Sequence, residues 1–170
     1  HSGDLRRHGY HPGNITALVE KVKTLDLLMI EGTSFSFDNE TDNQIQHTER
    51  DLLDEFTELL MDENRTIVIN PYPRNIERMI ALNNVANKLE RPIHWDVKFS
   101  KLLKRYTAEE VHTWTTLDQL SDQVIQLHFD DYDLLSQLNS GVYLHMNGEP
   151  LGDYDPRYEV LINKLEKHNF

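Results

Sequence analysis

Polar residues able to bind a phosphate or a metal ion follow three apolar segments that read as strands. They occupy the stretches Glu31–Ser34, Asn70–Asn75 and His145–Pro150. In an open parallel sheet, ligands bind beyond the carboxyl ends of the strands. The side chains of these three loops are therefore the first candidates for a functional site.

Three residues in these loops are the candidate substrate-binding residues: Arg74, Asn75 and His145. Arg74 and Asn75 open a predicted helix, where free backbone N–H groups and a guanidinium can hold a phosphate. An ordinary helix cap at Asn75 with a solvated Arg74 explains the same residues equally well. His145 ends a predicted strand and is the histidine that we expect to face substrate. The histidines form no i, i+4 pair typical of a helical metal site.

Charge and composition exclude several classes of protein. The 17 Lys+Arg residues against 29 Asp+Glu leave a net charge of −12, which argues against passive coating of a nucleic acid. Net charge does not exclude an enzyme that meets phosphate through a metal ion or a local basic patch. Lys98–Arg105 contains the only basic patch, for which a solvated helix face is the commoner explanation and an RNA groove the alternative.

The absence of cysteine excludes a disulfide scaffold, thiolate metal sites and cysteine nucleophiles, and it agrees with a reducing compartment. No apolar run approaches the roughly 20 residues that cross a bilayer. These observations predict a cytoplasmic protein without a membrane anchor.

Alternating strands and helices must position the candidate residues. Thr48 followed by Asp51 predicts a helix start, and Pro71–Pro73 ends a β-branched strand. Because alternating strands and helices connect by crossovers, we predict an α/β fold with a doubly wound (Rossmann-like), mainly parallel sheet and helices on both faces. The predicted strands are 25–32, 66–70, 92–95, 124–127 and 142–146, and the predicted helices are 48–60, 76–89, 97–106, 132–138 and 158–165, with a polar loop over 34–46.

Three motifs occur in a defined order along the chain. Ser2–Gly9 reads Ser-Gly-Asp-Leu-Arg-Arg-His-Gly, Leu27–Thr33 ends in Glu-Gly-Thr, and Asn75–Arg78 reads Asn-Ile-Glu-Arg. In this order the motifs resemble the β-CASP group of the metallo-β-lactamase fold, the nuclease branch that includes ribonuclease J and the cleavage factor that trims messenger-RNA ends. Leu138–His145 and Asn147–Gly152 resemble the closing strand and turn of the same domain, so the resemblance spans nearly all 170 residues.

The resemblance implies a zinc-dependent metallohydrolase that cleaves the phosphodiesters of single-stranded RNA. In the family, the aspartate that Asp4 matches bridges two zinc ions. The acidic residue that Glu31 matches orients a metal ligand or the proton path of the leaving group. Asp4 is therefore the expected metal ligand and Glu31 the expected catalytic residue. Residues 1–40 would be a flank of the lactamase fold and 41–170 the β-CASP domain.

One motif of the family, His-x-His-x-Asp-His, has no match in the chain. A zinc site needs about three or four protein ligands, and the resemblance supplies one, so the fragment alone is expected to bind no zinc and to cleave nothing. Catalysis would belong to the parent protein, in which two metal ions make a hydroxide nucleophile and clamp the phosphate. We interpret the chain, which begins without methionine, as a domain excised from that parent and partnered by its metallo-β-lactamase domain.

Two alternatives to the ribonuclease hypothesis stay open. Pro71–Pro73 alters the loop expected to touch RNA, so a lactamase-fold hydrolase of DNA, or of a small phosphodiester or ester, is the first. The second is a non-catalytic α/β binding module, for which neither Gly-x-Gly-x-x-Gly nor Gly-x-x-x-x-Gly-Lys-Ser/Thr is present. Assembly into a homo-oligomer is compatible with every one of these hypotheses.

Overall fold

The computed structural model describes residues 9–22, 24–29, 48–118, 120–148 and 154–170. The chain divides into two compact units, His1–Asp54 and Glu55–Phe170. Among the described residues, no helix combines the length and the apolar content needed to span a membrane.

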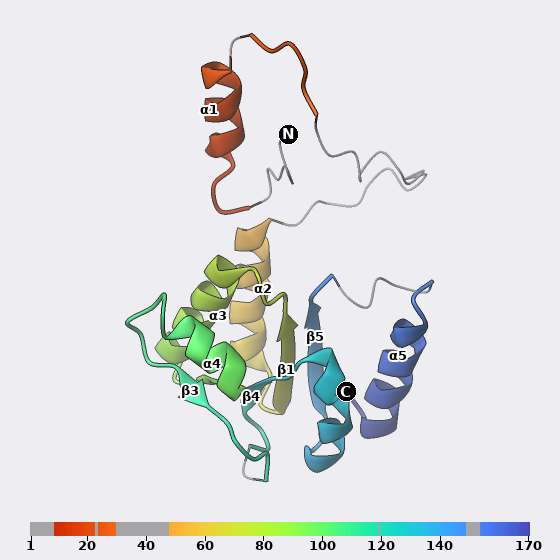
Figure 1. The fold of residues 1–170 in the computed structure, drawn as a ribbon. Coiled ribbons are helices and arrows are strands. Elements are labelled where there is room, and N and C mark those ends of the chain that lie inside the picture. Colours follow the sequence, from red (N-terminus) through yellow and green to blue (C-terminus); the bar gives the residue numbers. More distant parts are fainter. Residues whose placement is uncertain (1–8, 23, 30–47, 119, 149–153) are drawn as a thin grey trace. The chain divides into compact units, whose positions relative to one another are not determined.

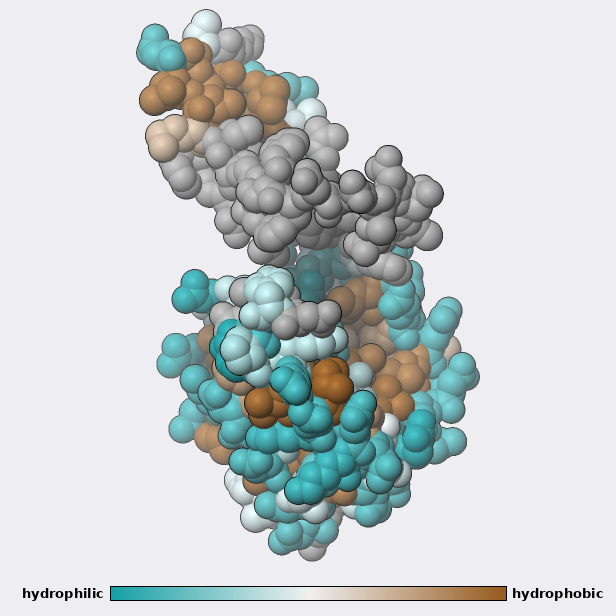
Figure 2. Space-filling model, turned by 90° about the vertical axis from the view of Figure 1, so that its right-hand side faces the viewer, coloured by the Kyte–Doolittle hydropathy of each residue, from teal (hydrophilic) through white to brown (hydrophobic). Residues whose placement is uncertain are grey.

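The first unit contains helix α1 (Gly13–Lys21), which buries none of its residues. Hydrophobic side chains gather at the top of Figure 2, and Leu18, Val19, Leu27 and Leu28 are among the exposed hydrophobic residues of this unit. The strand predicted over 25–32 is wrong for its described part, because residues 24–29 form no regular structure. A strand needs a neighbouring strand for its backbone hydrogen bonds, and no described residue supplies one to this segment.

The second unit contains a five-stranded parallel sheet with the order β3-β2-β4-β1-β5. The central strand β1 pairs in parallel with both β4 and β5. This confirms the predicted α/β fold with a mainly parallel sheet. The strands are β1 (Thr66–Pro71), β2 (Ile93–Trp95), β3 (His112–Thr113), β4 (Val124–Gln126) and β5 (Gly141–Met146).

Helices cover both faces of this sheet, as predicted. Figure 1 shows α3 and α4 on one side of β1, with α5 on the other. The helix predicted over 132–138 is a 3₁₀ helix that begins three residues earlier. The helices are α2 (Glu49–Asp62), α3 (Ile76–Lys88), α4 (Val97–Leu103), the 3₁₀ helix η2 (Phe129–Gln137) and α5 (Pro156–His168).

Local sequence signals explain where these helices begin. At the start of α2, the Asp51 backbone N–H donates to Thr48 Oγ1 at 3.2 Å and the Thr48 N–H donates to Asp51 Oδ2 at 2.8 Å. This reciprocal pair is the capping arrangement that the sequence predicts. Asp96 caps α4 and Asp155 caps α5, in both cases by accepting a backbone N–H.

The apolar core follows the two-residue alternation of the strands. Val68 and Ile125 are register partners and share one face, which packs against η2 and α5 through Tyr132, Leu135 and Leu161. Ile67 and Ile69 are also completely buried and face the opposite side. Each of the two layers of helices therefore has its own set of strand side chains to bury.

Candidate functional site

The carboxyl ends of four parallel strands bring four loops to one edge of the sheet. Tyr72 and Pro73 follow β1, Asp96 follows β2, His128 comes shortly after β4 and Asn147 follows β5. This edge is called the carboxyl edge below. It contains Arg74, Asn75 and His145, the three substrate-binding candidates predicted from the sequence.

The loop after β1 is tied directly to the end of β5. Asn70 and His145 are register partners in the two strands. The Tyr72 N–H donates to the Met146 carbonyl at 3.2 Å, and Arg78 Nη1 donates to the same oxygen at 2.9 Å. The structure thus brings His145 and the Arg74–Asn75 loop to one corner of the sheet. Arg78, the last residue of the Asn-Ile-Glu-Arg motif, joins that corner by its contact with β5.

Asn75 is the N-cap of α3. Its Oδ1 accepts the Arg78 backbone N–H at 3.1 Å, so the ordinary capping explanation applies to this side chain. Arg74 is exposed, and its side chain makes no hydrogen bond or ion pair with any residue that the structure describes. Of these two candidates, Arg74 therefore has the side chain that is open to an anion.

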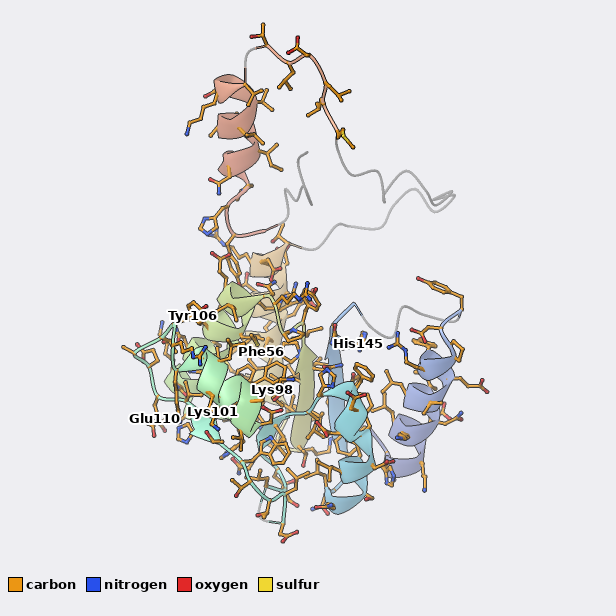
Figure 3. All side chains as sticks on the ribbon, in the orientation of Figure 1. Phe56, Lys98, Lys101, Tyr106, Glu110 and His145 are labelled. Atoms are coloured by element: carbon orange, nitrogen blue, oxygen red, sulfur yellow. The ribbon has the colours of Figure 1, made fainter. Side chains whose placement is uncertain are left out.

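A chain of polar groups runs from the buried Asn70 to the exposed His145, which lies at the end of β5 (Figure 3). Asn70 Nδ2 donates to the Tyr132 hydroxyl at 2.7 Å. The Tyr132 and Tyr143 hydroxyls form a hydrogen bond with each other. The Tyr143 hydroxyl lies 3.0 Å from His145 Nδ1. Burial raises the pKa of both tyrosines, so they stay protonated.

The ends of this chain differ in their hydrogen-bonding roles. An amide nitrogen can only donate, so the Tyr132 hydroxyl accepts from Asn70 Nδ2. Between Tyr132, Tyr143 and His145, the donor and acceptor roles follow the tautomer of the imidazole. Desolvation lowers the pKa of His145, in agreement with a neutral ring. The chain therefore places a neutral imidazole, held by Tyr143, at the carboxyl edge.

Two partly desolvated histidines make the stability of the fold depend on pH. Desolvation lowers the pKa of His145, and desolvation followed by the charge of His112 lowers the pKa of His94. Below the ordinary value of 6.5, the unfolded chain binds more protons than the folded chain, so stability is lost as pH falls. We expect the free energy of urea unfolding to decrease from about pH 7.5 to about pH 5.5, and to decrease less in the double variant His94→Gln/His145→Gln. Equal decreases in the two proteins would contradict this assignment.

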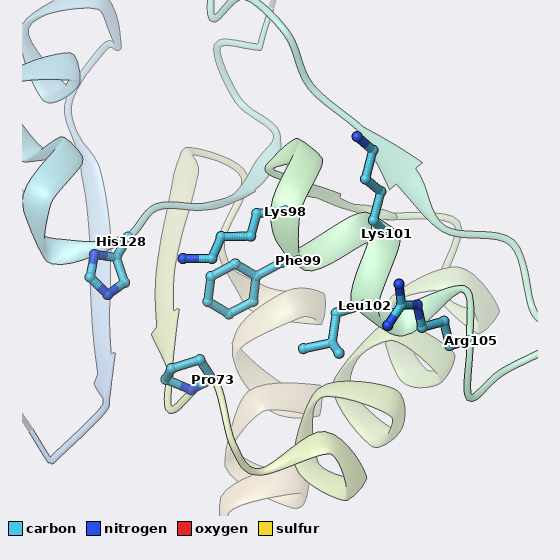
Figure 4. A pocket seen from close by; sticks show the side chains of 7 residues that line it. All are labelled: Pro73, Lys98, Phe99, Lys101, Leu102, Arg105 and His128. Carbon is cyan, nitrogen blue, oxygen red and sulfur yellow. The ribbon is translucent and has the colours of Figure 1, made fainter.

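A pocket with a volume of 340 Å³ opens at the same edge (Figure 4). Its apolar floor consists of Pro73, Phe99 and Leu102. Cationic side chains surround this floor, and in Figure 4 Lys98 extends toward His128 while Arg105 lies beside Leu102. The lining residues are Pro73, Lys98, Phe99, Lys101, Leu102, Arg105 and His128.

The three long cations of the pocket have no anionic partner within the described part of the chain. Lys98, Lys101 and Arg105 are exposed, and none of them makes an ion pair or side-chain hydrogen bond there. His128 differs, because its Nδ1 lies 3.2 Å from Asp130 Oδ2. In a chain of net charge −12, this gathering of unpaired cations makes the pocket a local site for an anion.

One buried donor at the carboxyl end of β4 was not predicted. Gln126 is completely buried at the end of β4, and its Oε1 accepts the Asp96 N–H at 3.1 Å. Its Nε2 has no hydrogen-bond partner among the described residues. Lys98 lies in the basic patch that the sequence shows over Lys98–Arg105, for which an RNA groove was one explanation. The carboxyl-end rule applied after Gln126 also finds His128, which the three predicted loops did not include.

The two acidic candidates, Asp4 and Glu31, lie outside the described residues. Within the described ranges, no group of three or more His, Asp or Glu side chains is arranged to hold a metal ion. The described residues form a binding surface with unpaired cations, an imidazole and an apolar floor.

Comparison with known proteins gives no family for the chain: no family model, curated protein or solved structure matches it.

Proposed function

We propose that this chain is the β-CASP domain, with a flank of the metallo-β-lactamase fold, of a cytoplasmic metallohydrolase that cleaves single-stranded RNA. In this proposal the carboxyl edge binds the RNA, and the parent protein's lactamase domain supplies the zinc ions and the reaction. Three motifs, around Asp4, Glu31 and Asn75 in that order along the sequence, support this family. The absence of cysteine from all 170 residues agrees with a reducing cytoplasm.

The observation that carries the RNA-binding part of the proposal is the set of unpaired cations at the carboxyl edge. Lys98, Lys101 and Arg105 surround one pocket, and Arg74 follows the loop residue Pro73 that lines it. Phosphate neutralisation by such side chains dominates the affinity of proteins for nucleic acids. The pocket has a volume of 340 Å³ and an apolar floor, which favours a single strand whose bases are unpaired over a duplex.

Zinc binding and RNA cleavage by the parent protein test this proposal. We expect about two zinc ions per chain and cleavage of single-stranded RNA, and we expect Asp4→Ala to lose both. Asp26→Ala is the matched control, because Asp26 is an exposed aspartate outside the motifs. Zinc without RNA cleavage would move the proposal to DNA or a small phosphodiester. A parent without zinc, or an Asp4→Ala variant with full zinc and full cleavage, would contradict the proposed family.

A further inference from the structure

The pocket at the carboxyl edge has an apolar floor, which a site for phosphate alone does not require. Its middle is apolar, since Pro73 and Leu102 are half-buried there and Phe99, only 4% exposed, closes the floor from beneath. A hydrated inorganic anion gains nothing from such a floor, whereas a flat organic group buries apolar surface against it. The ligand that fits the floor therefore has an uncharged, flat part.

The charges of the pocket lie on two sides of this floor. In Figure 4, the Lys98 ammonium lies on the side of His128, and the Arg105 guanidinium lies beside Leu102 on the other side. Lys101 points away from the floor and lies on the rim. The order of features across the pocket is thus cation, apolar floor, cation. A ligand that matches it carries an anion at each end of a flat group.

We propose that this pocket receives one internal nucleotide of an RNA strand, with the base on Leu102 and Pro73, one flanking phosphate on Lys98 and the other on Arg105. The proposal rests on the proposed function and adds to it the unit of substrate that the pocket takes. Arg105 can bind a phosphate with two parallel N–H donors, and Lys98 binds one as a point charge. A volume of 340 Å³ is at the small end of the range for organic ligands, which agrees with one nucleotide.

A nucleoside 3′,5′-bisphosphate reproduces one nucleotide with both of its phosphates, so adenosine 3′,5′-bisphosphate is the probe. In calorimetric titrations of the full 170-residue chain, we expect one bisphosphate per chain. Adenosine 5′-monophosphate should bind about tenfold more weakly, because it loses one charge-assisted contact, and inorganic phosphate more weakly again. Equal affinity for bisphosphate and inorganic phosphate would overturn the proposal.

Charge-reversal variants on one short segment locate the ligand. Lys98→Glu and Arg105→Glu should each weaken bisphosphate binding about tenfold or more. Lys104→Glu is the matched control, since Lys104 is exposed at the end of α4, does not line the pocket and should leave the affinity within about twofold. Unchanged affinity in Lys98→Glu or Arg105→Glu, or an equal loss in Lys104→Glu, would overturn the placement.

The floor is tested separately from the charges. Leu102→Glu places a carboxylate where the base would lie, and it should abolish bisphosphate binding. Leu102→Ser, which removes apolar surface without adding charge, should weaken it. Circular dichroism verifies that each variant is folded, and Leu102→Ser serves alone if Leu102→Glu does not fold. Full affinity in a folded Leu102→Ser variant would mean that no base lies on the floor and would overturn the proposal.

Single-stranded RNA in the same titrations separates this inference from the proposed function. RNA binding that depends on Lys98 while the bisphosphate does not bind would leave the proposed function standing and overturn the nucleotide pocket. Bisphosphate binding without RNA binding would contradict both the proposed RNA substrate and RNA as the ligand of this pocket, and it would leave only a site for a free nucleotide.

Discussion

Replacement of Lys98 and Lys101 together by glutamate is expected to lower the affinity of the chain for single-stranded RNA about 100-fold at low salt, about tenfold for each reversed charge. Both side chains line the pocket and have no anionic partner among the described residues. Each phosphate that a lysine neutralises contributes about 0.7 to the slope of log affinity against log salt for a single strand. The slope should therefore decrease by about 1.4 in the double variant.

The matched control for this experiment is the double variant Lys88→Glu/Lys104→Glu. This control has the same net charge as the Lys98→Glu/Lys101→Glu variant. Lys88 and Lys104 are both exposed and do not line the pocket. Fluorescence anisotropy of a labelled single-stranded oligonucleotide, measured over a salt series, gives both the affinity and the slope. If the two double variants lose affinity equally, the effect belongs to net charge, and the carboxyl edge is not the RNA-binding surface.

Gly141→Ala is expected to decrease the free energy of unfolding by about 3 kcal/mol. Gly141 opens β5 opposite Thr66 of β1. A Cβ atom at this position would lie 2.0 Å from the Thr66 carbonyl oxygen and 2.8 Å from Phe170 Cε1. A backbone oxygen in a central strand cannot move aside as a flexible side chain can. The pairing of β1 with β5 must therefore open at its first register pair.

Gly148→Ala provides the control, because a Cβ atom there would meet nothing within 4 Å among the described residues. Urea unfolding of the two variants, with the slope of the transition checked for two-state behaviour, measures the difference. A loss below about 1 kcal/mol in Gly141→Ala would show that the two strands separate at this point at little cost.

Much of the second unit could be predicted from the sequence because its local signals agree with its tertiary structure. The β-branched run Thr66–Ile69 is central and buried. Helix α2, which begins in the first unit at the capped Thr48 and ends in the second, has leucines at helical spacing. In such segments, propensity, periodicity and end signals all favour the same element. The predicted strands and helices of this unit are accordingly found within a few residues of their predicted bounds.

Three of the differences between the predicted and the observed elements have physical reasons. The two-residue strand β3 is too short to show a period, and it exists because His112 and Thr113 pair with His94 and Trp95. The turn over 129–137 has apolar residues at helical spacing, yet it winds as a 3₁₀ helix. Apolar composition alone did not distinguish a buried strand from an exposed irregular segment in residues 24–29.

The candidate site was predicted in part. The carboxyl-end rule found Arg74, Asn75 and His145, and the structure brings their loops together at one edge. The cap at Asn75 is a local contact three residues long, and it was one of the two explanations that the sequence offered for this residue. The polar chain from Asn70 through Tyr132 to Tyr143 depends on contacts between distant segments, which no spacing reveals. The pocket around Lys98 depends on the strand order, since β2 and β4 are neighbours in the sheet but are separated by β3 in the chain.

The position of β1 between β4 and β5 also determines when the sheet can form during synthesis. Thr66 pairs with Gly141, and Ile67 pairs with Val124. The backbone groups on both sides of β1 therefore have no partner strand until β4 and β5 have been synthesised. At about 5–20 residues per second, β1 is outside the ribosome with unpaired N–H and C=O groups for several seconds. During this period, a β-branched, uncharged strand of the nascent chain can pair with other chains. We therefore expect a chaperone that covers residues 66–71 to raise the yield of folded protein.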